Sequence, residues 1–117
     1  MDNIKKGRVG EGVARKYLLD KGYRILESNY RNRIGEIDII AFYRGVLVFV
    51  EVKTRTNTNF GYAYEAVNRK KQLKIINTSM IYVKSKGYGN IQLRYDIIEV
   101  YLTGKSEINH IENAFCL

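Results

Sequence analysis

Two apolar runs around a tight turn most constrain how this chain can fold. Residues 35–42 (GEIDIIAF) and 46–53 (VLVFVEVK) are rich in β-branched and aromatic residues, and they flank the segment YRG. This pattern is typical of a β-hairpin. Both runs also carry charge, with Glu36 and Asp38 near one end and Glu51 and Lys53 at the other. Charged residues at these positions indicate either a solvated strand face or a buried polar site.

The loop of this hairpin decides whether the charged side chains meet. Strand residues alternate between the two faces of a sheet, so Glu36 shares a face with Asp38, and Glu51 shares one with Lys53. A two-residue loop at positions 44–45 places Asp38 opposite Glu51 and Glu36 opposite Lys53. A four-residue loop would keep them on one face, whereas a three-residue loop would separate them. The predicted meeting therefore depends on the loop length.

Two opposed carboxylates call for a counter-charge. At about 5 Å they repel by about 3 kcal/mol at an effective dielectric near 20. A divalent cation reverses the sign, and Mg²⁺ prefers carboxylates, waters and phosphates as ligands. With Lys53 beside the metal, these are the parts of a metal-dependent phosphodiester hydrolase. A solvated face is the alternative, although the same face also carries apolar side chains: Ile40, Phe42, Leu47 and Phe49.

Periodicity and turn residues predict the remaining elements. They are two helices, over residues 5–21 and from Asn68 to about residue 84, and strands over residues 23–30, 91–102 and 108–115. The order is α-β-β-β-α-β with a trailing strand, which predicts an α/β fold with a mixed sheet flanked by helices. Val9 and Met80 lie in the apolar stripes of the two helices. No linker divides residues 1–117, so we expect a single domain.

The charge balance favours a polyanionic partner. The 117 residues contain 20 Lys and Arg against 12 Asp and Glu, a formal net charge of +8. Nucleic acid is the first candidate partner and an anionic membrane surface the second. A basic protein without such a partner is the alternative.

Several classes of protein are excluded or disfavoured. Cys116 is the only cysteine, so neither an intrachain disulfide framework nor a Cys-rich zinc site can form. His110 is the only histidine, and its surroundings fit no catalytic triad or HExxH site. The N-terminus lacks an apolar stretch typical of a signal peptide, and the apolar runs are too short to span a bilayer. We expect a cytoplasmic protein.

A motif resemblance sharpens the hydrolase interpretation. GEIDIIA followed by VFVEVKTR resembles the PD-(D/E)xK signature of restriction-endonuclease-like nucleases, with Asp38 as the first acid and Glu51-Val52-Lys53 as (D/E)xK. The proline of the first motif is replaced by Ile37. Longer stretches also resemble the YraN-like family, a group of small bacterial proteins similar to archaeal Holliday junction resolvases; they are residues 7–41, 48–55, 66–72 and 94–100. The resemblance implies a restriction-endonuclease-like core.

The same resemblance implies roles for individual residues. Asp38 and Glu51 would bind Mg²⁺ or Mn²⁺, with the backbone carbonyl of Val52 as a further ligand. Lys53 would orient the attacking water. Glu11, in GEGVA, matches a helical glutamate that resolvase-like nucleases place near the metal. Its alternative role is that of a first-turn glutamate favoured by the helix dipole.

Three further polar residues have competing interpretations. Gln72, in NRKKQ, resembles a glutamine on the helix after the lysine strand, or it is an ordinary exposed helix residue; Ile76 stands where some relatives have a tyrosine. Glu36 belongs to the family-like GEID, or it is the ion-pair partner of Lys53. Asp96, in RYDIIEV, is interpreted as structural.

Basic residues near the predicted site indicate phosphate contacts. We expect nucleic-acid contacts from Arg15, Arg33, Arg55, Arg69, Lys70, Lys71 and Lys74. Phe60, Tyr62 and Tyr64 could stack on unpaired bases, with core packing as the alternative.

The predicted function is that of an Mg²⁺- or Mn²⁺-dependent endonuclease acting on DNA, including branched or damaged forms. The alternatives are a non-catalytic nucleic-acid-binding module on a nuclease fold, and an adaptor that binds through its C-terminal strand. The resemblance to junction resolvases implies a homodimer by analogy only.

Overall fold

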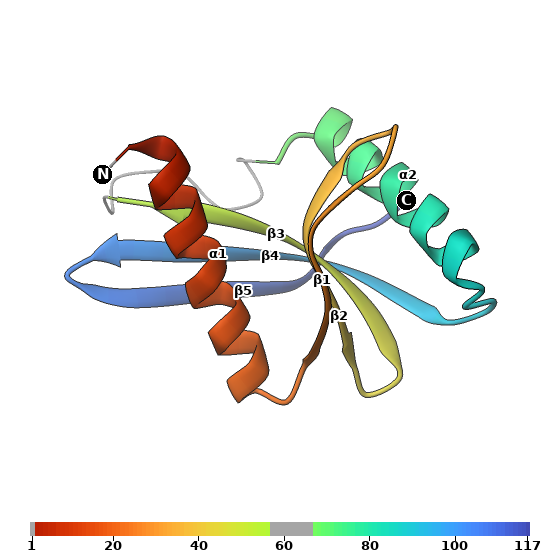
Figure 1. The fold of residues 1–117 in the computed structure, drawn as a ribbon, viewed down its shortest axis with the longest axis horizontal. Coiled ribbons are helices and arrows are strands. Elements are labelled where there is room, and N and C mark those ends of the chain that lie inside the picture. The colour runs from red at the N-terminus through yellow and green to blue at the C-terminus, as the bar shows by residue number, and fades with distance from the viewer. Residues whose placement is uncertain (1, 57–66) are drawn as a thin grey trace.

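The computed structural model describes residues 2–56 and 67–117. The elements are α1 (Asn3–Asp20), β1 (Arg24–Arg31), β2 (Glu36–Tyr43), β3 (Val46–Arg55), α2 (Arg69–Lys86), β4 (Gln92–Thr103) and β5 (Lys105–Phe115). The predicted order is confirmed, and the trailing strand is longer than expected (Figure 1). The predicted stacking residues Phe60, Tyr62 and Tyr64 lie outside the described residues.

The five strands form one mixed sheet in the order β1-β2-β3-β4-β5. The β1–β2, β2–β3 and β4–β5 pairs are antiparallel, and β3 and β4 are parallel. The parallel pair requires a crossover, because both strands run in the same direction, and α2 provides it. The predicted fold class, an α-β-β-β-α-β core with a mixed sheet flanked by helices, is confirmed.

The β2–β3 turn has the geometry on which the site prediction depends. Arg44 and Gly45 have φ angles of 49° and 80°, and two consecutive positive φ values are typical of a two-residue type I′ hairpin turn. Tyr43 pairs with Val46, and the ladder runs to the pair between Ile39 and Val50. The predicted register is therefore confirmed over this span, and the ladder ends immediately before Asp38 and Glu51.

Each face of the sheet packs against one helix (Figure 1). Ala14 and Leu18 of α1 are fully buried against Val48 and Val50 of β3 and Ile98 of β4. On the other face, α2 covers a cluster that includes Ile40, Leu47, Phe49, Ile75, Ile76 and Tyr82. Burial on both faces explains why β3 is apolar almost throughout, since neither side of the strand is left to water.

Three predicted placements are wrong. Met80 and Val9 were expected in apolar helix stripes, but they are 44% and 42% exposed. α2 instead buries a face that includes Ser79, whose hydroxyl lies 2.6 Å from the buried Tyr95 hydroxyl. Strand alternation predicts that Ile37 lies on the face opposite Ile40, yet both pack in the α2-side cluster. This departure from alternation lies beyond Ile39, where the ladder between β2 and β3 has ended.

In the described parts of the chain, no helix combines the length and the apolar character needed to cross a membrane.

Candidate active site

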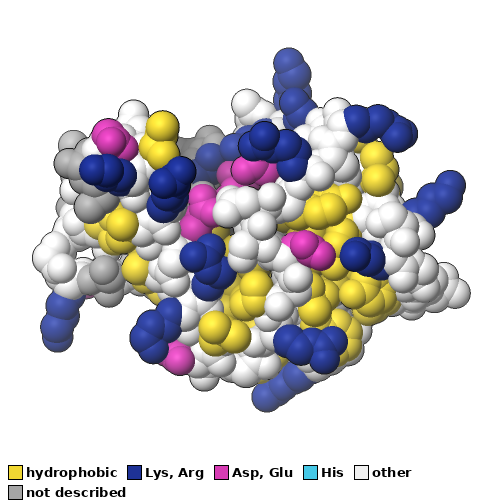
Figure 2. Space-filling view, in the orientation of Figure 1, with side chains coloured by type: hydrophobic (Ala, Val, Ile, Leu, Met, Phe, Trp, Pro, Cys, Tyr) yellow, Lys and Arg dark blue, Asp and Glu magenta, His cyan; other side chains and the backbone are white. Residues whose placement is uncertain are grey.

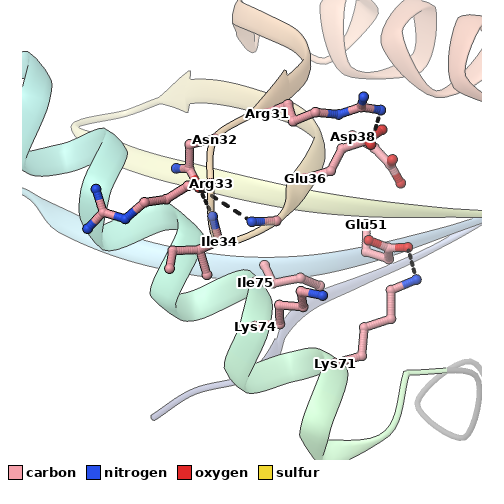
Figure 3. Close-up of a pocket in the computed structure, with 11 residues that line it drawn as sticks. Arg31, Asn32, Arg33, Ile34, Glu36, Asp38, Glu51, Lys71, Lys74 and Ile75 are labelled. Carbon is pink, nitrogen blue, oxygen red and sulfur yellow. Dashed lines mark hydrogen bonds and ion pairs between the residues drawn. The ribbon is translucent and has the colours of Figure 1, made fainter.

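A cavity of about 520 Å³ lies between the β1–β2 turn, the beginning of α2 and the middle of the sheet (Figure 3). It is lined by Arg31, Asn32, Arg33, Ile34, Gly35, Glu36, Asp38, Glu51, Lys71, Lys74 and Ile75. The two acids that the hairpin register predicted to meet thus line one cavity, and basic side chains from the turn and the helix surround them.

Asp38 is held at the point where the β2–β3 ladder ends. Its Oδ2 accepts a 2.8 Å hydrogen bond from the backbone N–H of Val52. Burial, followed by the negative charge of Glu51, raises the pKa of Asp38 to about 7, although the Val52 N–H acts in the opposite direction. Burial next to Glu51 thus disfavours the ionised form of Asp38, and a cation placed at the two carboxylates would relieve this cost.

Glu51 projects from β3 and is only 7% exposed. Its Oε1 lies 3.0 Å from Nζ of Lys71 and 3.5 Å from Nζ of Lys53. Burial lowers the pKa of Lys53, and the charge of Lys71 adds to this, while Glu51 offsets part of it. Burial alone would also lower the pKa of Lys71, but the charge of Glu51 raises it above its ordinary value. Two ammonium groups therefore neutralise one buried carboxylate.

Glu11 approaches these acids from α1. Its pKa is raised first by burial and further by Glu36 and Glu51, against a hydrogen bond with Asn29. α1 has no acidic residue in its first turn, so the alternative role of Glu11 as a first-turn glutamate is wrong. Glu11 also lines a second cavity of about 560 Å³.

Gly10 allows α1 to lie close to β3. A Cβ atom at Gly10 would lie 1.9 Å from Oγ1 of Thr54, so a side chain at this position cannot fit without displacement. Glu11 follows Gly10 directly and is positioned by this contact. The helix therefore approaches the candidate site through a residue with no side chain.

The residues present fit a Mg²⁺ or Mn²⁺ ion that keeps most of its water. Asp38 and Glu51 offer hard oxygen ligands, and the Val52 carbonyl is adjacent in the chain. Among residues 2–56 and 67–117, no group of three or more acidic, histidine or cysteine side chains is arranged to hold a metal. The residues therefore do not fit a metal that needs an all-protein cage. They fit an ion completed by waters and a phosphate, as Mg²⁺ prefers.

The rim of the cavity is basic. Arg33 and Lys74 line it from the β1–β2 turn and from α2 (Figure 3). Arg31 forms a 2.7 Å ion pair with Glu36, which corrects the expectation that Glu36 pairs with Lys53. On the side of the molecule seen in Figure 1, Figure 2 shows lysine and arginine side chains scattered over the surface, several beside acidic side chains, rather than gathered into one patch. Among the residues that line the cavity, the positive charge thus comes from a few side chains of the β1–β2 turn and α2.

Comparison with known proteins identifies the family of this chain. The model of a family described as "Uncharacterised protein family UPF0102" matches residues 10–100. The chain belongs to this family. A UPF0102 protein of Clostridioides difficile is 53% identical over 115 residues, covering 98% of this chain and 100% of that protein. A UPF0102 protein of Caldanaerobacter subterraneus subsp. tengcongensis is 51% identical over 113 residues, covering 93% of each. The sequence-based assignment to the YraN-like family is confirmed.

One solved structure has a weak likeness to this UPF0102 chain. It is the structure of Pyrococcus furiosus SfsA in complex with Ca²⁺, with a TM-score of 0.38 and 15% identity. The alignment covers 96% of this chain and 64% of that protein.

Several predicted site residues of the UPF0102 chain lie outside the cavity. Gln72 donates from Nε2 to the Val67 carbonyl at 2.9 Å and accepts from Arg69 at 3.1 Å. Arg69 also donates to the Cys116 carbonyl at 2.7 Å, so both side chains fasten the beginning of α2. Arg55 lies 3.5 Å from the buried Glu99 in an ion pair.

Two further residues predicted to contact nucleic acid, one on α1 and one on α2, do not line the cavity. Arg15 lies close enough to Glu11 to lower its pKa, and Lys70 is exposed. Lys70 therefore remains available to a partner at the surface of α2. Lys71, its neighbour, points instead to Glu51.

Sequence reasoning missed how the β1–β2 turn is fastened to α2. Oδ1 of Asn32 accepts from the backbone N–H groups of Ile34 and Gly35, and Nδ2 donates to the Thr78 carbonyl at 3.2 Å. A Cβ atom at Gly35 would lie 2.9 Å from Oγ1 of Thr78, so glycine permits this close approach. The spacing of Asn32 and Gly35 between two strands is a turn signal that could have indicated it.

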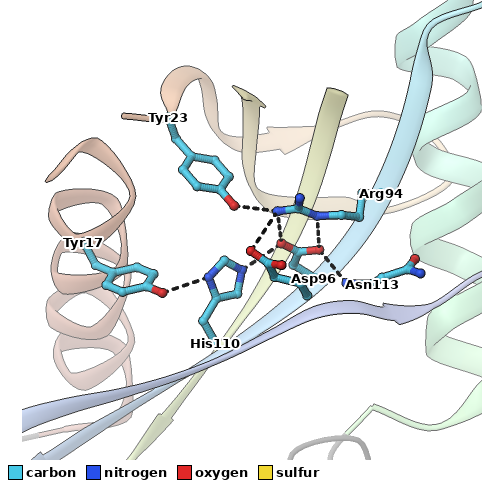
Figure 4. Close-up of polar contacts among 7 residues, drawn as sticks. Tyr17, Tyr23, Arg94, Asp96, His110 and Asn113 are labelled. Carbon is cyan, nitrogen blue, oxygen red and sulfur yellow. Dashed lines mark hydrogen bonds and ion pairs between the residues drawn. The ribbon is translucent and has the colours of Figure 1, made fainter. Parts of the chain in front are cut away.

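Asp96 forms a buried polar network away from the cavity (Figure 4). It is fully buried, and its carboxylate accepts two bonds from Arg94 at 2.9 and 2.8 Å and one from the Asn113 N–H at 2.9 Å. His110 Nε2 lies 2.7 Å from Asp96, and His110 Nδ1 lies 3.0 Å from the Tyr17 hydroxyl. The network joins α1, β4 and β5, which supports the structural interpretation of Asp96.

This network also sets the ionisation of Asp96. Burial alone would raise the pKa of Asp96, but hydrogen bonds from His110, Arg94 and the Asn113 N–H outweigh it and hold the pKa below its ordinary value. Asp96 is therefore a stably ionised, fully bonded carboxylate, in contrast to Asp38. Of these two aspartates, only Asp38 has an environment that an added cation would relieve.

Proposed function

We propose that this UPF0102 protein is a metal-dependent endonuclease that hydrolyses phosphodiester bonds in DNA. The observation that carries the proposal is the pair of carboxylates of Asp38 and Glu51, which line one cavity beside the ammonium group of Lys53. The raised pKa of Asp38 supports a site built for a cation, because burying two neighbouring carboxylates otherwise destabilises the fold. The cavity opens between basic residues suited to a phosphate chain.

Each residue then has a chemical role. Asp38, Glu51 and the Val52 carbonyl would hold Mg²⁺ or Mn²⁺, which, when bound, lowers the pKa of a water and neutralises charge on the phosphate. Lys53 donates hydrogen bonds to the attacking water or to a phosphate oxygen as charge develops there. Glu11, which lines the neighbouring cavity with Glu36, would orient a further water. Arg33 and Lys74 bind flanking phosphates without reading sequence.

A second candidate function has one observation in its favour. Glu51 is already neutralised by ammonium groups at 3.0 and 3.5 Å, so the cavity is electrostatically consistent without a metal. A nuclease fold that binds nucleic acid without cutting it would need no more than this. It would bind DNA in a salt-dependent manner, show no turnover with any divalent ion, and lose no affinity on substitution of Glu51.

A cleavage panel separates these functions. Linear, flapped, gapped and four-way-junction DNA are incubated with Mg²⁺ or Mn²⁺ and with the wild type, Glu51→Gln, Lys53→Ala or Glu107→Gln. Glu107 is an exposed residue of β5 and serves as the matched control. We expect the first two variants to lose about 100-fold or more in cleavage rate and to retain binding, while the control keeps both. Cleavage unchanged in both site variants would rule out the assigned roles.

The panel also addresses the finer substrate prediction. Preferential cleavage of the junction, flap or gap over linear DNA would identify branched or damaged DNA as the substrate. Dimer formation and a cytoplasmic location stay predictions from the sequence.

A further inference from the structure

We propose that Lys71 is a built-in counter-ion for Glu51, which a divalent cation displaces and which then contacts the substrate phosphate. This inference rests on the proposed function, because it assigns a regulatory step to the same site. It concerns a residue that the sequence motif does not include, since Lys71 comes from α2 rather than from the (D/E)xK strand.

The distances single out Lys71. Its Nζ lies 3.0 Å from Oε1 of Glu51, whereas Nζ of Lys53 lies 3.5 Å from the same oxygen. The nearer counter-ion of the buried carboxylate is therefore the lysine from the helix. Lys71 and Asp38 line the same cavity. The Lys71 ammonium thus lies in the cavity whose two carboxylates would hold a cation.

The exposed fractions of the two lysine side chains indicate which of them can move away from Glu51. The Lys71 side chain is 46% exposed, while the Lys53 side chain is 22% exposed. Lys71 reaches Glu51 from the open side of the cavity, along a flexible four-carbon stem. Figure 3 shows it extending from the beginning of α2 to Glu51, with Lys74 one turn further along the helix. Lys53 is fixed on the same strand as Glu51 and has less freedom to move away.

A cation and this ammonium cannot both be accommodated without cost. A doubly charged ion at Glu51 repels a lysine held 3.0 Å from the same carboxylate. Release frees the Lys71 ammonium within the cavity, which already carries Lys74 and Arg33 at its rim. There it can bind a phosphate oxygen. Without a metal, Lys71 would neutralise the buried carboxylate of Glu51. With a metal bound, Lys71 would instead bind a phosphate oxygen of the substrate.

Metal binding tests the competition directly. Mn²⁺ is titrated calorimetrically into the metal-free wild type, Lys71→Met and Lys70→Met, the last of which removes the same charge from the adjacent exposed position. We expect Lys71→Met to bind Mn²⁺ about tenfold more tightly than the wild type, and Lys70→Met to bind as the wild type does. Glu51→Gln is titrated as well. If the wild type binds Mn²⁺, Glu51→Gln does not, and Lys71→Met binds no more tightly than the wild type, the inference is overturned and the proposed function stands. No binding by any of these proteins would overturn both.

Thermal unfolding provides a second measurement, which remains informative when a variant is less stable than the wild type. Without metal, Lys71→Met should melt below Lys70→Met, because Glu51 loses its nearer counter-ion. Added Mn²⁺ should then raise the melting temperature of Lys71→Met by more than that of the wild type, since a ligand stabilises the state that it binds more tightly. Equal shifts in the three proteins would contradict the displacement of Lys71.

Discussion

The backbone N–H of Val52 donates a 2.8 Å hydrogen bond to Oδ2 of Asp38, just beyond the last paired residues of β2 and β3. In the register of the hairpin this N–H would face Ile37, but the two strands part before that pair forms. The Asp38 carboxylate takes the place of the missing backbone partner. The end of the ladder therefore fixes one acid of the candidate site beside Glu51 and, at the same time, partly shields it from water.

This arrangement predicts an unusual dependence of stability on pH in the metal-free protein. The folded-state pKa of Asp38 is raised to about 7, above an unfolded value of about 3.9. Between these values the native state binds more protons than the unfolded state, so the contribution of Asp38 is most favourable at low pH and is lost as the pH rises through about 7. We expect the wild type to lose stability relative to Asp38→Asn from about pH 5 to about pH 8. Urea unfolding with a chelator present measures this, and parallel profiles would contradict it.

Asp96 should show the opposite behaviour. Asp96→Asn leaves Arg94 without its buried partner, and we expect a loss of about 3–5 kcal/mol in the free energy of unfolding at neutral pH. Because the folded-state pKa of Asp96 lies below its ordinary value, this stabilisation is present above about pH 4 and is lost as the pH falls further.

Glu112 provides the control for Asp96. It lies 3.8 Å from Arg94 and its side chain is 58% exposed, so Glu112→Gln should change stability by less than about 0.5 kcal/mol. Chemical denaturation at neutral pH measures both variants. Equal effects would show that the buried network does not stabilise the fold.

The close approach of α1 to β3 can be tested with two glycines of one helix. A Cβ at Gly10 would collide with Thr54, whereas a Cβ at Gly7 would meet nothing within 4 Å. Gly10→Ala should therefore lower the free energy of unfolding by about 1–3 kcal/mol. Gly7→Ala should raise it by about 0.5–1 kcal/mol, because alanine favours a helix. Denaturation midpoints compare the two, and a neutral Gly10→Ala would mean that α1 does not contact β3 as described.

Lys74 should contribute a phosphate contact. It lines the cavity beside the acids, while Lys105 is an exposed residue at the beginning of β5. Lys74→Met should weaken DNA binding and reduce the slope of log affinity against log salt by about 0.9. Lys105→Met should leave the slope unchanged. Fluorescence anisotropy over a salt series measures both, and identical slopes for the two variants would place the DNA elsewhere.

Local sequence patterns were enough to predict the hairpin and its acids. Alternating β-branched residues predicted the two strands, and a two-residue loop at Arg44–Gly45 was one of the loop lengths that the sequence allowed. The structure has that loop, and its register brings Asp38 and Glu51 to one end of the strand pair. These features depend on residues close together in the chain, because a two-residue turn determines every pairing that follows from it. The element order followed from the same kind of pattern.

Contacts between distant segments could not be predicted in this way. The sequence did not reveal that Lys71 rather than Gln72 faces the acids, since a rotation of about 100° along a helix separates neighbouring residues. Packing of Ile75, Ile76 and Tyr82 against the sheet sets that rotation. The sequence thus determined which acidic groups the hairpin carries. Tertiary packing decided which helix lysine neutralises Glu51, because only the packing of α2 against the sheet brings Lys71 to β3.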